Sequence, residues 1–272
     1  GFSSPATKIM LRELDIWTSR TLIMGTAGAL LLTIGFLGKK ELKVPKECYR
    51  DLIIAALLNM TVFQICMTLG VHYFSAGRTV VVVYTMPLWA ILFAWFILKE
   101  PIPLSRLIAL VLGLAGLAVL MSQDFSHLKD PGLGAACTVI AAISFGLGTV
   151  WMKRRTWVTD PTVVAGWQLL IGTVPLVPLW LILGTDTDWA NLSLVTLGNF
   201  IFLILIANVL AYFLWFRILQ IFPASVSGLG TLAVPIVGVI ASSTLLTETF
   251  GVNELLALVL IISALAMNLK TP

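Results

Sequence analysis

The sequence is a series of apolar segments of about 20 residues, separated by short charged or Gly/Pro-rich breaks. The complete segments are residues 16–37, 52–74, 79–98, 105–121, 133–152, 162–183, 194–216, 227–246 and 253–269. A helix of this length spans the hydrocarbon core of a bilayer, which is about 30 Å thick. Membrane barrels are instead built from strands of about ten residues with alternating polarity. The pattern therefore predicts an all-α integral membrane protein.

Few residues in the chain could cover a water-facing surface. Of the 272 residues, 59% are hydrophobic and 11% are charged, whereas a soluble domain carries about 25% charged residues. The 17 basic residues outnumber the 13 acidic ones. They cluster in loops, however, and nowhere alternate with aromatic residues as in a nucleic-acid groove. We therefore expect a lipid bilayer as the surroundings and no nucleic acid as a partner.

No motif predicts a cofactor, a metal site or a catalytic centre. A phosphate-binding loop has the form G-x-x-x-x-G-K-[ST], which residues 38–40 do not fit. The three cysteines lack metal-ligand spacing. The two histidines, His72 and His127, form no H-E-x-x-H motif. An intramembrane enzyme, the main alternative class, is therefore disfavoured, and we expect neither a cofactor nor a metal.

Residues 1–10 are too few to span a membrane, but small and apolar side chains followed by charged ones are typical of a helix end. The second half of the chain contains a complete counterpart, because an offset of 145 positions pairs Gly1 with Gly146 and Lys8 with Lys153. We therefore expect a tenth span, truncated in this sequence, that begins before Gly1. We expect no signal peptide in this sequence, because it contains no charged segment followed by a cleavage site.

The chain contains an internal duplication. An offset of 148 positions superposes residues 69–120 on 217–268 without a gap, and it pairs Pro87 with Pro235 and Glu100 with Glu248. We predict two five-helix repeats, residues 1–122 and 133–270, joined by a loop at 123–132. An odd number of spans per repeat makes the second repeat enter the membrane from the opposite side. The repeats are therefore predicted to be inverted.

Loop charges predict the orientation of the chain. The loop after the second span carries five basic residues, Lys39, Lys40, Lys43, Lys46 and Arg50, whereas its counterpart at 184–189 carries none. Summed over each side of the membrane, the loops hold 12 and 5 Lys or Arg residues. Basic loops stay in the cytoplasm. Both termini are therefore predicted to be cytoplasmic.

Polar residues recur at helical spacing inside the spans. Thr61, Gln64, Thr68 and His72 lie at i, i+3, i+7 and i+11, which places them on one stripe of a helix. The eighth span carries a second stripe at i, i+4 and i+7, formed by Asn208, Tyr212 and Trp215, and the fourth, sixth and ninth spans each add more than one candidate. The further candidates are Arg78, Thr85, Trp89, Ser144, Trp151, Asn208, Tyr212, Trp215, Ser227 and Thr231. We interpret these residues as the lining of a substrate cavity. The alternative is that they only form hydrogen bonds between helices.

Two prolines lie inside equivalent spans, Pro87 in the fourth and Pro235 in the ninth. Proline removes a helical hydrogen bond and favours a kink, so we predict that these helices act as gates. Inverted halves exchange outward-open and inward-open states around a site near the midplane. No Asp or Glu lies in mid-membrane, where ion coupling needs one. We therefore predict a facilitator that works by alternating access.

The sequence resembles the drug/metabolite transporter superfamily, in particular the bacterial EamA family and its YddG-type amino-acid exporters. The likeness is carried by residues 1–8, by 76–78 leading to 84–89, by Glu100, and in the second repeat by Ala224, Pro235 and Glu248. It implies a ten-helix carrier of the bacterial inner membrane with a central cavity between six of its helices.

The resemblance also implies a class of solutes. Members of the family export amino acids and related small metabolites, and the aromatic candidates would suit amino acids with aromatic or apolar side chains. Carriers of a choline-like cation, a drug or a sugar phosphate, with proton coupling in some of them, remain alternatives within transport. A purely structural or receptor role would not need two inverted repeats with polar stripes.

Overall fold

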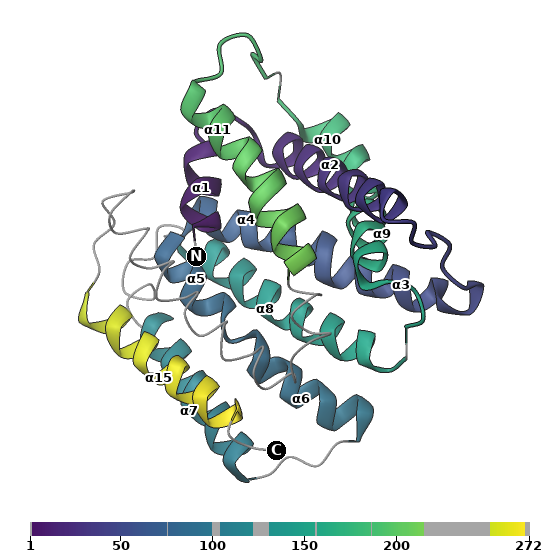
Figure 1. The fold of residues 1–272 in the computed structure, drawn as a ribbon. Helices are drawn as coiled ribbons and strands as arrows, with labels where there is room; N and C mark the ends of the chain where they lie inside the picture. Colours follow the sequence, from purple (N-terminus) through teal and green to yellow (C-terminus); the bar gives the residue numbers. More distant parts are fainter. Residues whose placement is uncertain are drawn as a thin grey trace.

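A computed structural model describes residues 2–74, 76–99, 104–121, 131–155, 157–185, 187–214 and 251–269 (Figure 1). All regular secondary structure within these residues is helical. The prediction of an all-helical fold is confirmed for this part of the chain.

The helices of the first half follow one another with short connections. They are α1 (Ser3–Met10), α2 (Ile16–Leu37), η1 (Lys46–Cys48), α3 (Tyr49–Ala56), η2 (Leu57–Val62), α4 (Phe63–Tyr73), α5 (Ala76–Val83), α6 (Met86–Leu98) and α7 (Leu104–Met121). The predicted span at 79–98 is interrupted between α5 and α6. Pro87 lies in the first turn of α6, where its missing N–H does no harm and its ring prevents the helix from continuing unbroken.

The described helices of the second half are α8 (Pro131–Lys153), α9 (Pro161–Thr173), α10 (Leu176–Leu183), α11 (Leu194–Phe202), η4 (Leu203–Leu210) and α15 (Val252–Leu269). Five continuous helical stretches are long and apolar enough to cross a membrane: Ile16–Leu37, Lys46–Tyr73, Gly132–Lys153, Pro161–Leu183 and Leu194–Leu214. Each agrees with a predicted span to within two residues, except that the stretch Lys46–Tyr73 begins six residues before the predicted 52–74.

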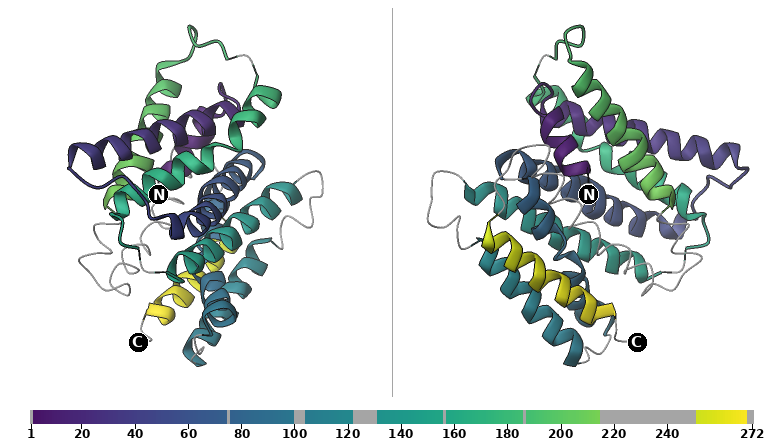
Figure 2. Two further views of the ribbon diagram at one scale, coloured as in Figure 1. Left: turned by 90° about the vertical axis from the view of Figure 1, so that its right-hand side faces the viewer. Right: turned by 60° about the vertical axis from the view of Figure 1, so that its left-hand side comes forward.

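The packing brings together helices that are distant in sequence. Helices α7 and α15 lie side by side, and so do α2 and α9 (Figures 1 and 2). Helix α4 packs on α8, and α1 packs on α11. Close packing of α2 on α9 depends on glycine, because a Cβ atom on Gly28 would lie 3.0 Å from the carbonyl oxygen of Gly166. Such close approach through small residues is common between membrane helices.

Large apolar side chains cover the outside of the molecule. Leu37, Phe96, Leu181, Ile182 and Leu194 are all more than two-thirds exposed. Such a surface is unfavourable in water but matches lipid tails. Polar groups, by contrast, gather inside the bundle, where the candidate site lies.

Two helices that the offset of 148 positions pairs each contain a π-helical segment. One is η2, at residues 57–62, and the other is η4, at residues 203–210. The offset of 148 moves residues 57–62 onto 205–210, inside η4. Such wide turns are rare and occur frequently at functional sites.

Candidate functional site

A buried arginine lies at the centre of the candidate site. Arg20, in the second turn of α2, is 4% exposed, and it is the one charged residue classed as buried among the residues whose exposure is described. Burying an unpaired charge in an apolar interior costs several kcal/mol. The position of Arg20 therefore calls for a compensating partner.

The guanidinium of Arg20 connects three helices. Its Nη2 atom donates to Oγ1 of Thr7 in α1 at 3.2 Å, and its Nη1 atom donates to Oε1 of Gln64 in α4 at 3.4 Å. Both distances exceed the 2.7–2.9 Å typical of charge-assisted hydrogen bonds. Its Nε atom is buried without an acceptor. In the described part of the chain, Arg20 has no acidic partner.

A second polar cluster lies at the interface of α9 with the helix of residues 46–73. Nδ2 of Asn59 lies 3.5 Å from Oε1 of Gln168, and Nε2 of Gln168 lies 3.6 Å from the sulfur of Met152. Gln168 is 3% exposed. The cluster is neutral, and these weak contacts leave Oδ1 of Asn59 buried without a partner.

The polar stripe predicted at residues 61–72 divides among several neighbours. Thr61 donates to the carbonyl oxygen of Gly172 in α9 at 2.8 Å, whereas Gln64 faces Arg20 of α2. Thr68 is buried and donates to the Gln64 carbonyl of its own helix at 2.7 Å. His72 is exposed and packs edge-on against Tyr73. The stripe thus contacts α9 at one end and Arg20 in its middle.

Of the two candidates in α8, Ser144 is buried and forms a hydrogen bond to a neighbouring helix. Ser144 donates to the carbonyl oxygen of Leu58 at 2.6 Å, and the π-helical η2 begins beside that residue. Trp151, in the last turns of α8, stacks with Arg154, whose guanidinium carbon lies 4.3 Å from the ring centroid. The indole Nε1 of Trp151 is buried without an acceptor.

The candidates in the eighth span lie in or next to η4. Asn208 is buried and donates to the carbonyl oxygen of Leu203, five residues earlier, at 2.7 Å. This bond fits the wider turn of a π-helix. The hydroxyl of Tyr212 lies 3.4 Å from the sulfur of Met60 in η2. Tyr212 therefore joins the two equivalent helices at their π-helical segments.

The fourth span places its candidates around the break between α5 and α6. Thr85 is buried and donates to the carbonyl oxygen of Val82 at 2.8 Å, while the indole of Trp89 donates to Oγ1 of Thr85 at 3.3 Å. The guanidinium of Arg78 lies 5.7 Å from the ring centroid of Phe74. The candidates Trp215, Ser227, Thr231 and Pro235 lie outside the described residues.

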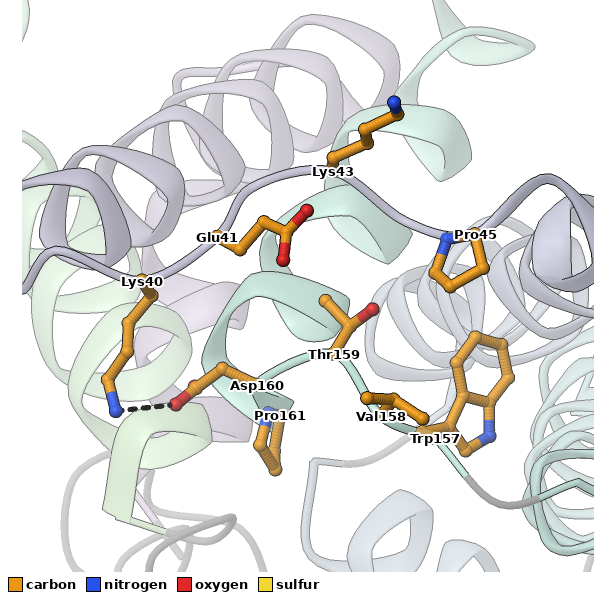
Figure 3. A pocket seen from close by; sticks show the side chains of 9 residues that line it. All are labelled: Lys40, Glu41, Lys43, Pro45, Trp157, Val158, Thr159, Asp160 and Pro161. Atoms are coloured by element: carbon orange, nitrogen blue, oxygen red, sulfur yellow. Dashed lines mark ion pairs between the residues drawn. The ribbon is translucent and has the colours of Figure 1, made fainter.

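A separate pocket of about 800 Å³ lies between two loops (Figure 3). Its lining includes Lys40 and Lys43 from the loop after α2, and Trp157 and Asp160 from the loop after α8. Lys40 pairs with Asp160 at 3.1 Å. Burial raises the pKa of the Asp160 carboxyl, but the backbone N–H of Thr162 and the Lys40 ammonium outweigh this effect and lower it below its usual value.

Sequence reasoning missed Arg20 and Gln168. Both lie near the start of an apolar segment, where a polar residue is easily taken for a membrane-interface residue. One signal was available, because the offset of 148 that reveals the duplication also pairs Arg20 with Gln168. Equivalent long polar side chains inside two spans point to the interior of the bundle. Among the described residues, no cluster of His, Cys, Asp and Glu could hold a metal ion.

Comparison with known proteins agrees with this picture. YoaV of Bacillus subtilis (strain 168), an uncharacterized transporter, is 25% identical over 276 residues, which cover all of this chain and 93% of YoaV. A probable amino-acid metabolite efflux pump of Escherichia coli (strain K12) is 26% identical over 71% of this chain and 67% of its own length. A crystal structure with 17% identity has a similar fold, with a TM-score of 0.65 over 97% of this chain and 93% of that one.

The family match extends over nearly the whole chain. Residues 1–122 and 132–270 each match the EamA-like transporter family. YoaV is named a transporter and the E. coli relative an efflux pump, in keeping with apolar helices that surround buried polar groups. This chain is a membrane transporter that belongs to the EamA-like transporter family of the drug/metabolite transporter superfamily.

Proposed function

We propose that this transporter exports amino acids, with aromatic or apolar side chains favoured, and related small metabolites by alternating access. The observation that carries the proposal is the cluster of buried polar groups from α1, α2 and α4 inside an otherwise apolar bundle. Polar groups at membrane depth are costly and usually mark a solute pathway. The E. coli relative, named a probable amino-acid metabolite efflux pump, supports this substrate class.

The packing of the helices supports two inverted repeats. The offset of 148 carries the bounds of α7 onto those of α15, and these two helices pack on each other. Helices α2 and α9, also equivalent, form a second such pair. The contact of α3 with α8 has its counterpart in that of α11 with α1. A twofold axis in the membrane plane relates contacts in this way, and halves so related can rock about a central site.

Two half-buried aromatic side chains support a substrate with an apolar or aromatic side chain. Trp89 is half-buried beside Thr85, and Tyr212 lies against Met60. Flat rings bind aromatic and apolar groups by stacking and burial. These two aromatic side chains are the reason why we include a preference for aromatic or apolar amino acids, as in YddG-type exporters, in the proposal.

A carrier of a choline-like cation is the second candidate. Such a site is built as a cage of aromatic rings, and Trp151 already stacks with a cation, the guanidinium of Arg154, at 4.3 Å. The buried cation Arg20 argues against it, because like charges repel in a low-dielectric interior. A sugar-phosphate carrier would need several buried Lys or Arg residues. Among the residues whose exposure is described, Arg20 is the one buried basic residue.

Transport in liposomes tests the proposal. We expect the purified full-length protein to exchange labelled L-phenylalanine across the membrane in a saturable manner without an imposed proton or sodium gradient. Choline and glucose 6-phosphate should not compete. Trp89→Ala and Gln64→Ala should each lower the flux about tenfold, as loss of one polar or aromatic contact within a binding site does, while the melting temperature changes little.

Several outcomes would contradict parts of the proposal. Exchange of choline without exchange of any amino acid would favour the second candidate. Accumulation driven by a pH gradient alone would show proton coupling instead of facilitated diffusion. We also propose that the protein resides in the bacterial inner membrane with both termini in the cytoplasm. A protease should therefore remove a C-terminal tag in inverted membrane vesicles but not in intact spheroplasts.

A further inference from the structure

We propose that Arg20 is the binding site for a carboxylate group of the transported solute, with Thr7 and Gln64 holding its guanidinium in position. The inference rests on the proposed function and narrows it, because it makes a carboxylate a requirement for transport. It is argued from the charge, the burial and the incomplete hydrogen bonding of one side chain.

The charge of Arg20 lacks compensation in the described structure. Its two hydrogen bonds, to Thr7 and Gln64, go to neutral oxygens at 3.2 and 3.4 Å. An arginine that serves packing alone is usually saturated by carbonyl or carboxylate oxygens, since an unneutralised buried charge is strongly destabilising. Here Nε remains buried without an acceptor. The guanidinium therefore has both charge and hydrogen-bonding capacity left for a ligand.

The depth of the group indicates a solute rather than a lipid headgroup. Gln64, which lies against the guanidinium, is nine residues from the end of its helix at Tyr73, or about 14 Å at 1.5 Å per residue. Three helices, α1, α2 and α4, enclose the guanidinium. A lipid headgroup stays at the membrane surface, whereas a solute crosses this region.

A carboxylate fits the site better than a phosphate does. A guanidinium and a carboxylate carry opposite single charges and form bidentate hydrogen bonds. A phosphate ester carries nearly two negative charges at neutral pH. Arg20 is the one buried charged residue among those of described exposure, so a bound phosphate would remain partly uncompensated. The neighbours Thr7 and Gln64 are neutral and add no charge.

A pair of ligands that differ only in the carboxylate tests the inference. L-Phenylalanine and L-phenylalaninamide have the same ring and the same amino group. We expect the wild-type protein to exchange the acid at least about tenfold faster than the amide, as expected when a charge-assisted contact is lost. Arg20→Gln should lower exchange of the acid by a similar factor and change that of the amide less than twofold. Arg20→Lys should recover part of the loss for the acid.

The control is an arginine remote from the site. Arg155 pairs with Asp51 at 2.7 Å just after the end of α8, so Arg155→Gln also removes one positive charge but should leave both exchange rates unchanged. An equal loss of acid and amide exchange in a folded Arg20→Gln protein would assign Arg20 a purely structural role. Equal exchange of acid and amide by the wild type would also overturn the inference.

A second variant decides the question if Arg20→Gln does not fold. Gln64→Glu keeps the shape of the side chain and places a carboxylate beside Arg20 within the protein. We expect this variant to melt at a higher temperature than the wild type and to lose acid exchange, because its own carboxylate occupies the guanidinium. Undiminished acid exchange in Gln64→Glu would refute the inference.

The inference and the proposed function fail in different ways. If the wild type exchanges no amino acid, the proposed function is wrong. Thermal stabilisation by 3-phenylpropanoate, compared with 3-phenylpropanamide, then still decides whether Arg20 binds carboxylates. Stabilisation by the acid alone, lost in Arg20→Gln or Gln64→Glu, supports the inference, and equal effects of the two ligands contradict it.

Discussion

Arg20 in α2 and Gln168 in α9 are paired by the offset of 148 positions, yet their surroundings differ. Each lies near the start of its helix and is almost fully buried. Both contact the same neighbouring helix at residues 46–73, Arg20 through Gln64 and Gln168 through Asn59. One side chain carries a full charge, and the other is neutral.

Two halves that match the same family therefore differ in charge at paired positions. Gln168 contacts neutral groups of the protein, so its contribution is explained by packing. The charge of Arg20 has no counterpart within the described structure. A strictly symmetric carrier would place Gln168 against Tyr212, the equivalent of Gln64, but the hydroxyl of Tyr212 lies beside the sulfur of Met60 instead. The asymmetry is concentrated where a solute with distinct ends would bind.

The largest effect is expected from placing the charge in the other repeat. Gln168→Arg introduces a guanidinium among Asn59, Met152 and apolar neighbours, with no acid in the described surroundings. An uncompensated buried charge costs about 3–5 kcal/mol. We expect a large fall in the melting temperature of the purified protein, followed by the fluorescence of a thiol-reactive dye.

Gln168→Met is the matched control, because it keeps the volume and removes only the weak polar contacts. Its melting temperature should stay close to that of the wild type. If Gln168→Arg is as stable as the wild type, the bundle tolerates a buried arginine without a ligand. The burial of Arg20 would then need no functional explanation.

Five of the predicted spans agree with long apolar helices of the structure, because lipid burial requires about 20 consecutive apolar residues in each helix. The break beside Pro87 follows equally from local chemistry. The helices that the polar stripe at residues 61–72 contacts could not be predicted in full. A regular helix advances 100° per residue, but residues 57–62 form a π-helix with wider turns. Thr61 therefore contacts α9 while Gln64 contacts α2.

Arg20 was hidden for another reason. Its partners Thr7 and Gln64 are 13 and 44 residues away in sequence, and no local periodicity links them. Sequence reasoning sees one charge near the end of a span, where arginine commonly reaches the membrane surface. The contact depends on the tertiary packing of three helices, which hydropathy does not encode.

A smaller effect is expected from truncating the two amides that face these side chains. Gln64→Ala removes an acceptor of Arg20, and we expect about tenfold slower L-phenylalanine exchange in liposomes, since a hydrogen bond to a charged group contributes about 1.5–3 kcal/mol. Asn59→Ala removes the contact with Gln168 and should change exchange less than twofold. Equal losses in the two variants would show that the repeats contribute alike to the site.

The smallest effect is expected at the N-cap residues of α2 and α9. Asp15 caps α2 by accepting from the backbone N–H groups of Trp17 and Thr18, and Asp160 caps α9 by accepting from Thr162. Oδ2 of Asp160 also pairs with Lys40 at 3.1 Å, whereas Oδ2 of Asp15 is buried without a partner. The two caps thus repeat the contrast between a compensated and an uncompensated charge.

Substituting asparagine for each aspartate separates the charge from the cap. Asparagine keeps a cap oxygen, so Asp160→Asn should lose only the interaction with Lys40 and lower stability at pH 7 by about 0.5–1 kcal/mol. The pKa of Asp160 is lowered in the folded protein. Its charged form therefore adds stability above the unfolded value of about 3.9, and this contribution is lost as the pH falls through the lower folded value.

The melting difference between wild type and Asp160→Asn should accordingly be constant near neutral pH and shrink below about pH 4. Asp15→Asn should not be less stable than the wild type at pH 7, because it removes a charge that has no ionic partner in the described structure. A greater loss in Asp15→Asn than in Asp160→Asn would reverse the assignment of the two caps. It would also show that a buried charge without an ionic partner can stabilise this part of the protein, which would weaken the case for a ligand at Arg20.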